Sequence, residues 1–236
     1  FEVRPASPMR RSSYFFEDIQ GPTGKGRVTI KCRDILSRVK EGQPQIPVAT
    51  DGTLSANINA SVTSLTVDLP GAEPDFGQYQ QIGDSYAGLL YINDEVMRFT
   101  GATTGASSIT FTGLVRGIYG TTAEGHDADD KVQYGHEWVD EKPWLILRDI
   151  LANWADVPEE WIPLEEWEAE GSVWLLPYAD MTGAIVDPMD VEDALSELLE
   201  SIVASIWVDV AAQKIRLRAT RPITEIIIPV SNEDIL

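Results

Sequence analysis

The chain has 236 residues, of which 43% are hydrophobic, and a formal net charge of −20 at pH 7. This length suffices to bury a sizeable core, in one large or two modest domains. No apolar run approaches the roughly 20 residues that a membrane-spanning helix needs, so the sequence predicts no membrane insertion.

The charge is unevenly distributed along the chain. Residues 1–40 hold nine Lys or Arg and four Asp or Glu, whereas residues 137–201 hold two and eighteen. Because binding to a phosphate backbone needs clustered basic side chains, the acidic middle disfavours sequence-specific binding of nucleic acid. The basic N-terminal segment suits docking on an acidic neighbour, including the acidic middle of a second copy. A solvated strand face is the alternative that the sequence leaves open.

Residues 13–36 are predicted to form two strands joined by the turn GPTGKG at 21–26. Val28, Ile30 and Cys32 alternate with charged residues, so these three side chains are expected to share one face. The turn lacks the spacing of a phosphate-binding loop and is flanked by strands, so we interpret it as a β-turn.

Cys32 is the only cysteine, and it cannot form an internal disulfide. Free cysteines are usually buried, so we expect its thiol to pack in a core and not to act as a nucleophile. A chain without paired cysteines fits a protein that assembles inside a cell.

A polar segment with two prolines at residues 41–57 marks a boundary before a β module. Within the module, residues 82–92 place apolar side chains on both faces of a strand, which predicts that the strand is covered on both sides. The turn Asn93-Asp94 and the strands that follow it complete a compact sandwich or small barrel.

After Tyr134 the apolar period changes to that of helices. Helices are predicted near 141–154, where Pro143 suits a first turn, and near 188–206. The stripe of the second helix comprises Val191, Leu195, Leu198, Leu199, Ile202 and Ile206. A hairpin follows, in which Ile206, Val208 and Val210 face Ile215, Leu217 and Ala219. The order of elements predicts an α+β unit.

The amino-acid motifs of the module are more specific for a protein family than its alternation of apolar and polar residues. The strand pair LLYINDEVMRFT (89–100) and the later stretch RGIYGTTAEGH (116–126) resemble a module of the tail-tip and baseplate hub proteins of long-tailed bacteriophages. Two flanking stretches, RVTIKCRDILSRV at 27–39 and the run from 187 to 222, are similar to the first and second hub domains of that family.

This resemblance implies an α+β fold, predominantly β, with hub-type domains interrupted by an inserted module. Residues 1–45 would end a first hub β domain, residues 46–135 would form the inserted small β-sandwich or barrel, and residues 136–236 would form the second hub domain. The chain opens without a methionine, and we interpret it as an internal segment of a longer polypeptide.

The function that the resemblance implies is structural and not enzymatic. The expected partners are further copies of the chain in a trimer, together with other tail-tip, tail-tube and tape-measure proteins. DNA would pass through the hub without being bound specifically. The location would be the virion tail tip, and the host cytoplasm during assembly, with roles in host attachment and genome ejection.

The loop after the motif contains His126, Asp127, Asp129 and Asp130, a dense set of potential ligands. Its spacing does not match a calcium loop, so we favour a capped turn over a metal site and expect His126 to bond the backbone. Asp129 stands where the family usually has glycine, and aspartate tolerates the left-handed conformation that this position requires. We therefore predict no metal, cofactor-binding or catalytic residue.

The acidic stretch 156–170 contains carboxylate pairs such as Glu160 and Glu166 that a glycosidase mechanism would need. Because its acids are crowded without basic partners, we expect them on a surface that faces solvent or the lumen of a channel. On a channel wall, their like charge would repel DNA. Trp154, Trp161, Trp167 and Trp174 punctuate this region. They suit a core or a subunit interface, and a receptor or carbohydrate-recognition module is the alternative function.

Overall fold

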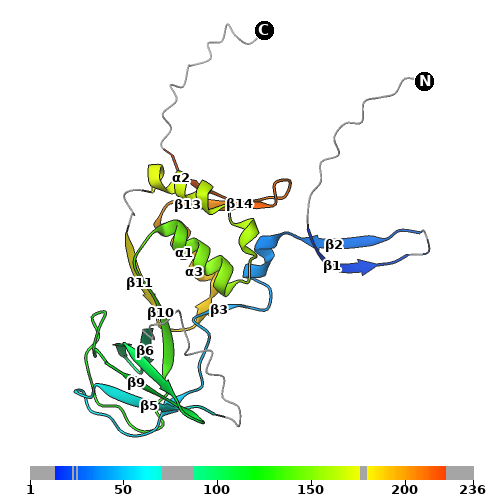
Figure 1. The fold of residues 1–236 in the computed structure, drawn as a ribbon. Helices are drawn as coiled ribbons and strands as arrows, with labels where there is room; N and C mark the ends of the chain where they lie inside the picture. Colours follow the sequence, from blue (N-terminus) through cyan, green and yellow to red (C-terminus); the bar gives the residue numbers. More distant parts are fainter. Residues whose placement is uncertain (1–13, 23, 25, 71–87, 176–179, 222–236) are drawn as a thin grey trace, which may run out of the picture.

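The computed structural model describes residues 14–22, 24, 26–70, 88–175 and 180–221. Strand (38%) exceeds helix (23%), and the strands form several small antiparallel sheets. The prediction of a mixed, predominantly β fold is thereby confirmed. Figure 1 shows a β-sandwich below a helical body, with a two-stranded arm leaving the body on the right.

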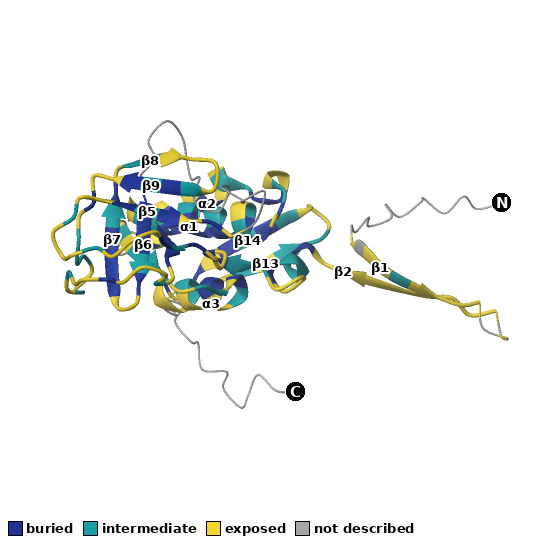
Figure 2. Cartoon of the chain, turned by 90° about the horizontal axis from the view of Figure 1, so that it is seen from below, coloured by how far each residue is buried: buried dark blue, intermediate teal, exposed yellow. Residues whose placement is uncertain are grey.

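The arm consists of β1 (Phe15–Gln20) and β2 (Thr29–Arg33), paired antiparallel. The predicted turn 21–26 connects them, and every described residue of it is exposed. Cys32 is exposed as well, so the prediction of a buried packing thiol is wrong. Alternation placed Cys32 correctly on an apolar face, but no second layer from the described residues covers that face (Figure 2).

The sandwich is built from two four-stranded sheets, ordered β4-β5-β9-β8 and β11-β10-β6-β7. Its strands are β4 (Thr53–Leu54), β5 (Ser64–Asp68), β6 (Gly88–Ile92), β7 (Glu95–Phe99), β8 (Gly101–Thr104), β9 (Ser108–Thr112), β10 (Gln133–Glu141) and β11 (Met181–Ile185). Alternate apolar residues of both sheets, such as Val67, Leu90 and Phe111, share one core.

The tight hairpin β6–β7 confirms the turn predicted at Asn93-Asp94, since Ile92 pairs with Glu95 across it. Leu89 and Leu90 point to opposite faces, and both are fully buried. The prediction of a strand covered on both sides is therefore confirmed from residue 88 onward. Residues 82–87 of that prediction lie outside the described residues.

Strand β10 joins the sandwich to the helical body. Its first residues, Gln133–Gly135, pair with β6, and its later residues pair with β11 (Met181–Ile185). Tyr134 packs in the core of the sandwich, whereas Trp138 packs against the core of the body. One strand thus belongs to both units (Figure 1).

The helical body surrounds a second core. Its elements are the 3-10 helix η1 (Ile35–Val39), β3 (Gln45–Ile46), α1 (Pro143–Asp149), the π-helix η3 (Ile150–Trp154), the 3-10 helix η4 (Glu159–Trp161), α2 (Leu164–Trp174), β12 (Met189–Asp190), α3 (Val191–Ser201), β13 (Ala204–Asp209) and β14 (Lys214–Ala219). Ile35, Val39 and Ile46 are buried in the same core as residues 144–219. The chain therefore enters the body, leaves it to build the sandwich, and returns. The division into three domains stays a prediction.

The helix predicted near 141–154 is present as α1 followed directly by η3. The helix predicted near 188–206 is shorter, because α3 ends at Ser201 and Ile206 lies in β13. Val203 adopts a positive φ of 51° between the two elements, which turns the chain out of the helix. The predicted hairpin is present, with Ile206 opposite Leu217 and Val208 opposite Ile215. The prediction is wrong for Val210, which lies beyond the end of β13, and for Ala219, which pairs with Ala204.

Helix α2 was not predicted, since its sequence reads as an acidic stretch with regularly placed tryptophans. It packs against α1 so closely that a Cβ on Gly171 would lie 2.1 Å from the ring of Trp144. A glycine inside a helix costs stability, and the close approach of the two helices explains why it is present here. Among the described residues, no helix is both long enough and apolar enough to span a bilayer.

Candidate functional site

The residues that carry the resemblance converge on Glu95, at the start of β7. Its side chain is 1% exposed, and it accepts two hydrogen bonds from Arg116, at 2.6 Å each. The backbone N–H groups of Gly117 and Glu124 also donate to it, at 3.1 and 3.0 Å. The Nε2 atom of His126 lies 2.8 Å from Oε2 of the same carboxylate.

The hydrogen bonds of Glu95 hold the loop 116–126 against the β6–β7 hairpin. Thr121 adds a bond of its own, because its hydroxyl accepts from the N–H of Val96 at 3.1 Å. Gly117 has a φ of +62°, and a Cβ there would lie 2.7 Å from the backbone nitrogen of Ala123. Glycine is thus required by both conformation and space.

Burial by itself would raise the pKa of Glu95, but the hydrogen bonds from Arg116, Glu124 and His126 outweigh it and lower the pKa to about 2. The carboxylate therefore stays ionised at neutral pH, and both of its oxygens are occupied by donors. A general acid or base needs a pKa near the working pH. The Glu95 cluster, comprising Glu95, Arg116 and His126, is chemically suited to hold a loop and not to transfer protons.

His126 does not cap its turn through the backbone as expected. Its Nε2 faces Glu95, and its Nδ1 lies 3.4 Å from the side-chain nitrogen of Asn93. The expectation was wrong because the partner, Glu95, is thirty-one positions earlier in the chain and only the fold brings it near.

The acidic loop itself is a capped turn. Asp130 accepts from the N–H of Asp127 at 3.0 Å and from Asn93 at 3.1 Å. Asp129 has a φ of 70°, which confirms the left-handed conformation predicted for it. The described residues contain no group of three or more His, Cys, Asp or Glu side chains placed to hold a metal ion.

A second polar cluster lies beside β10. Arg98 donates to both oxygens of Glu137, at 2.9 and 2.7 Å, and the hydroxyl of Tyr119 donates to the same carboxylate at 2.7 Å. Burial favours the neutral acid, but Arg98 and Tyr119 together lower the pKa of Glu137. Through Tyr119 and Glu137, this cluster connects the loop 116–126 to strand β10, which continues into the helical body.

His136 forms a third polar contact, with Asp149 of α1. Its Nε2 lies 3.0 Å from the carboxylate, which also accepts from Trp138 at 2.9 Å and from Asn153 at 2.6 Å. Burial acts against ionisation of Asp149, yet its hydrogen bonds from His136 and Asn153 lower its pKa. In the described part of the chain, neither histidine is hydrogen-bonded to a serine hydroxyl or a cysteine thiol, as a nucleophilic dyad requires.

The acidic stretch 156–170 has basic partners, contrary to the sequence interpretation. Glu166 pairs with Lys214 and Arg216 of β14, and Glu170 pairs with Arg221. Asp156 pairs with Arg38 and Glu159 with Arg148 in the same way. The partners come from distant parts of the chain, so the local sequence did not reveal them. Glu160, one half of the nominated pair, is exposed.

The four tryptophans of this region differ in their environments. Trp161 and Trp167 are 6% and 1% exposed, and Nε1 of Trp167 donates to the carbonyl of Ile215 at 2.9 Å. These two rings fill the core and offer no face to a sugar. Trp154 is half-buried, whereas Trp174 is 40% exposed, with Arg221 stacked 4.6 Å from its ring centre.

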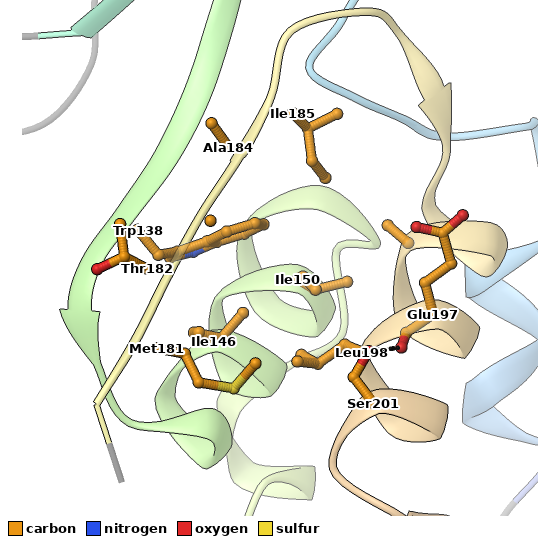
Figure 3. Close-up of a pocket in the computed structure, with 12 residues that line it drawn as sticks. Trp138, Ile146, Ile150, Met181, Thr182, Ala184, Ile185, Glu197, Leu198 and Ser201 are labelled. Carbon is orange, nitrogen blue, oxygen red and sulfur yellow. Dashed lines mark hydrogen bonds between the residues drawn. The ribbon is translucent and has the colours of Figure 1, made fainter. Parts of the chain in front are cut away.

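An apolar groove lies between strand β11 and helix α3, with a volume of about 180 Å³. Figure 3 shows Trp138, Ile146, Met181 and Leu198 lining it. Glu197 of α3 also lines the groove, and its backbone carbonyl accepts a bond from Ser201 at 2.7 Å. We call this feature the β11–α3 groove. Nothing in the sequence indicated it, because its lining comes from five separate elements, β10, α1, η3, β11 and α3.

No protein-family model, no curated protein and no solved structure matches this chain.

Proposed function

We propose that this chain is a structural, non-enzymatic subunit of the tail tip of a long-tailed bacteriophage. In this proposal it forms part of a trimeric hub that joins the tail tube to the tip. The hub surrounds the channel through which the DNA and the tape-measure protein leave.

The observation that carries the proposal is the insertion of the sandwich into the helical body. Ile35, Val39 and Ile46 share a core with buried residues of 144–175 and 191–219, while buried residues of 54–69 and 90–134 build a core of their own. This arrangement supports the order on which the resemblance rests, in which a small β module interrupts hub-type structure.

The chemistry of the motif points the same way. Glu95, Gly117 and His126 belong to the shared wording, and they hold one loop on one hairpin. When the residues of a motif fix the shape of a loop, the proteins that share the motif are expected to share a structural module. They are not expected to share a chemical reaction.

The acidic surface has a role in this proposal. Glu160, Glu165 and Glu168 are exposed, and we place them on the channel side of the hub. Like charge would keep the departing DNA from adhering to the wall. If a map of the assembled tail shows these residues on the outer surface of the ring, the channel assignment is wrong.

The proposal is tested on purified tails that contain the protein. We expect an electron-microscopy map to show three copies around the tail axis at the tip. Absence of the protein from purified tails would refute the proposal. An isolated monomer that binds a glycan would instead favour the receptor-recognition alternative, and Trp174→Ala is the variant to test there, because its ring is exposed.

A further inference from the structure

The arm β1–β2 has one apolar face and one charged face. The pairing places Phe16 opposite Cys32 and Ile19 opposite Ile30. Phe16 and Ile19 are three positions apart, which in a regular strand would put them on opposite faces. A bulge between Phe16 and Asp18 adds one residue and brings both to the same face.

The charged residues of the arm occupy the other face. Asp18 pairs opposite Lys31, and Glu17 accepts two hydrogen bonds from Arg33, at 2.9 and 2.7 Å. The bulge is therefore the device that separates apolar from charged side chains.

The apolar face of the arm is left open to solvent. Phe16 is 64% exposed, Ile19 55% and Ile30 58%. A two-stranded hairpin has marginal stability by itself and needs something packed on its apolar side. An apolar face of this kind marks an interaction surface.

The β11–α3 groove offers a complementary surface. Strand β11 is an edge of its sheet, so its outer N–H and C=O groups are available to an added strand. The lining of the groove is mostly apolar, and Figure 3 shows Met181, Ile185 and Leu198 among the side chains that form it. Its volume of about 180 Å³ accommodates an aliphatic or aromatic side chain.

Charge also matches between the arm and the groove. Residues 180–201, which contain β11 and α3, hold seven Asp or Glu and no Lys or Arg. Residues 14–33, which contain the arm, hold four Lys or Arg and two Asp or Glu. Opposite charge of this kind favours association and fixes its orientation.

The arm of a chain does not reach the groove of the same chain. Figure 1 shows β11 on the left of the body and the arm leaving on the right. Strand β1 has six residues and so spans only ~20 Å. An arm that occupies the groove is therefore the arm of another molecule.

We infer that the β1–β2 arm of one copy docks on the β11–α3 groove of a second copy of this chain. The contact joins two different surfaces, so its repetition closes a ring when the rotation between copies divides a full turn, and builds a filament otherwise. This inference rests on the proposed function for the ring it builds, but its test does not need a phage tail.

The single native cysteine makes the contact testable. Cys32 lies on the apolar face of the arm, and Ala184 of β11 lines the groove. We expect the Ala184→Cys protein, treated with a short bismaleimide, to give covalent species of two and three copies. The species should disappear when Cys32→Ser is added, and they should not form with Ser172→Cys, an exposed site on α2.

Two substitutions on the arm separate its faces. Ile30→Glu places a charge on the apolar face, whereas Thr29→Glu places one on the opposite face of the same strand. Both positions are exposed, so neither change should disturb the monomer, which circular dichroism checks. Light scattering coupled to size exclusion should show association weakened at least tenfold by Ile30→Glu and little changed by Thr29→Glu.

Three results would overturn the inference. They are a chain that stays monomeric at every concentration, an oligomer without cross-links that depend on Cys32, and equal effects of the two arm variants. Cross-linking of unaltered protein through Cys32 alone would indicate arm-to-arm contact instead. If the cross-links form but purified tails lack the protein, the proposed function is wrong and the arm-to-groove contact is supported. If tails carry a ring of this protein but the cross-links do not form, the proposed function is supported and the arm-to-groove contact is wrong.

Discussion

The sandwich and the helical body both contain ion pairs, but they place them differently. In the sandwich, Glu95 and Arg116 have side chains 1% and 6% exposed. In the body, Glu166 is 45% exposed, and its partners Lys214 and Arg216 are 37% and 30% exposed. A buried ion pair needs hydrogen bonds to all of its charged atoms, because it has lost its contact with water. An exposed ion pair contributes little to the stability of the fold. Acidic and basic side chains therefore fix the conformation of a loop in the sandwich, whereas in the body they form ion pairs on the surface.

The largest expected effect is that of Arg116→Met. It leaves the carboxylate of Glu95 buried without its main partner, and breaking a buried pair in this way costs about 3–5 kcal/mol. Urea unfolding measures the loss, and hydrogen exchange in β6 and β7 assigns it to the sandwich. Arg218→Met, at an exposed position of β14, is the control and should change stability by less than about 0.5 kcal/mol. Equal losses in the two variants would contradict the comparison.

The second prediction concerns pH. The pKa of Glu95 is about 2 in the folded chain, whereas a glutamate without these contacts has a pKa of 4.5. Folding is therefore favoured while the carboxylate is ionised. This stabilisation is present above about pH 4.5 and is lost as the pH falls towards 2, by about 3 kcal/mol in total. The urea midpoint of the sandwich should fall over this window. The fall should be shallower in Glu95→Gln, and an unchanged slope would show that other carboxylates dominate.

Gly117→Ala tests the loop that the buried cluster holds. Its Cβ would lie 2.7 Å from the nitrogen of Ala123 at a φ of +62°, so we expect a loss of about 2 kcal/mol or more. Gly120→Ala is the matched control, because its φ is +80° but nothing lies within 4 Å of the added atom. It should cost about 1 kcal/mol, the backbone term alone. A difference near zero would mean that the loop yields easily.

Glu166→Gln should have the smallest effect. It removes two exposed ion pairs with β14, and such pairs contribute less than about 1 kcal/mol. The loss should shrink further at high salt, which screens exposed charges. Glu165→Gln, on the same helix and exposed, is the reference for urea unfolding at low and high salt. A loss as large as that of Arg116→Met would refute the distinction between the two regions.

Local patterns predicted much of the fold. The turn at Asn93-Asp94, the strand covered on both faces and the existence of the β13–β14 hairpin followed from periods of two and from turn chemistry. Helix α2 was missed because its acidic residues and Gly171 obscured its period. The extent of α3 was overestimated because Ile202 and Ile206 continue its apolar spacing beyond Ser201, where the helix ends.

The candidate site was predicted less well than the fold. The motif residues were singled out, but the chemistry assigned to His126 was wrong, since its partner Glu95 lies in another strand. The acids of 156–170 were taken as lacking basic partners, although β14 supplies Lys214 and Arg216. Both errors concern contacts between residues far apart in the chain.

The sequence by itself determined the elements that depend on neighbouring residues. These are the strands and turns of the sandwich, the start of α1 and the separation of basic from acidic segments. The tertiary structure alone decided which charges are buried, which tryptophans fill the core and which apolar face stays open. Cys32 illustrates the difference: alternation fixed its face, but whether a second layer covers that face depends on elements that no local pattern specifies.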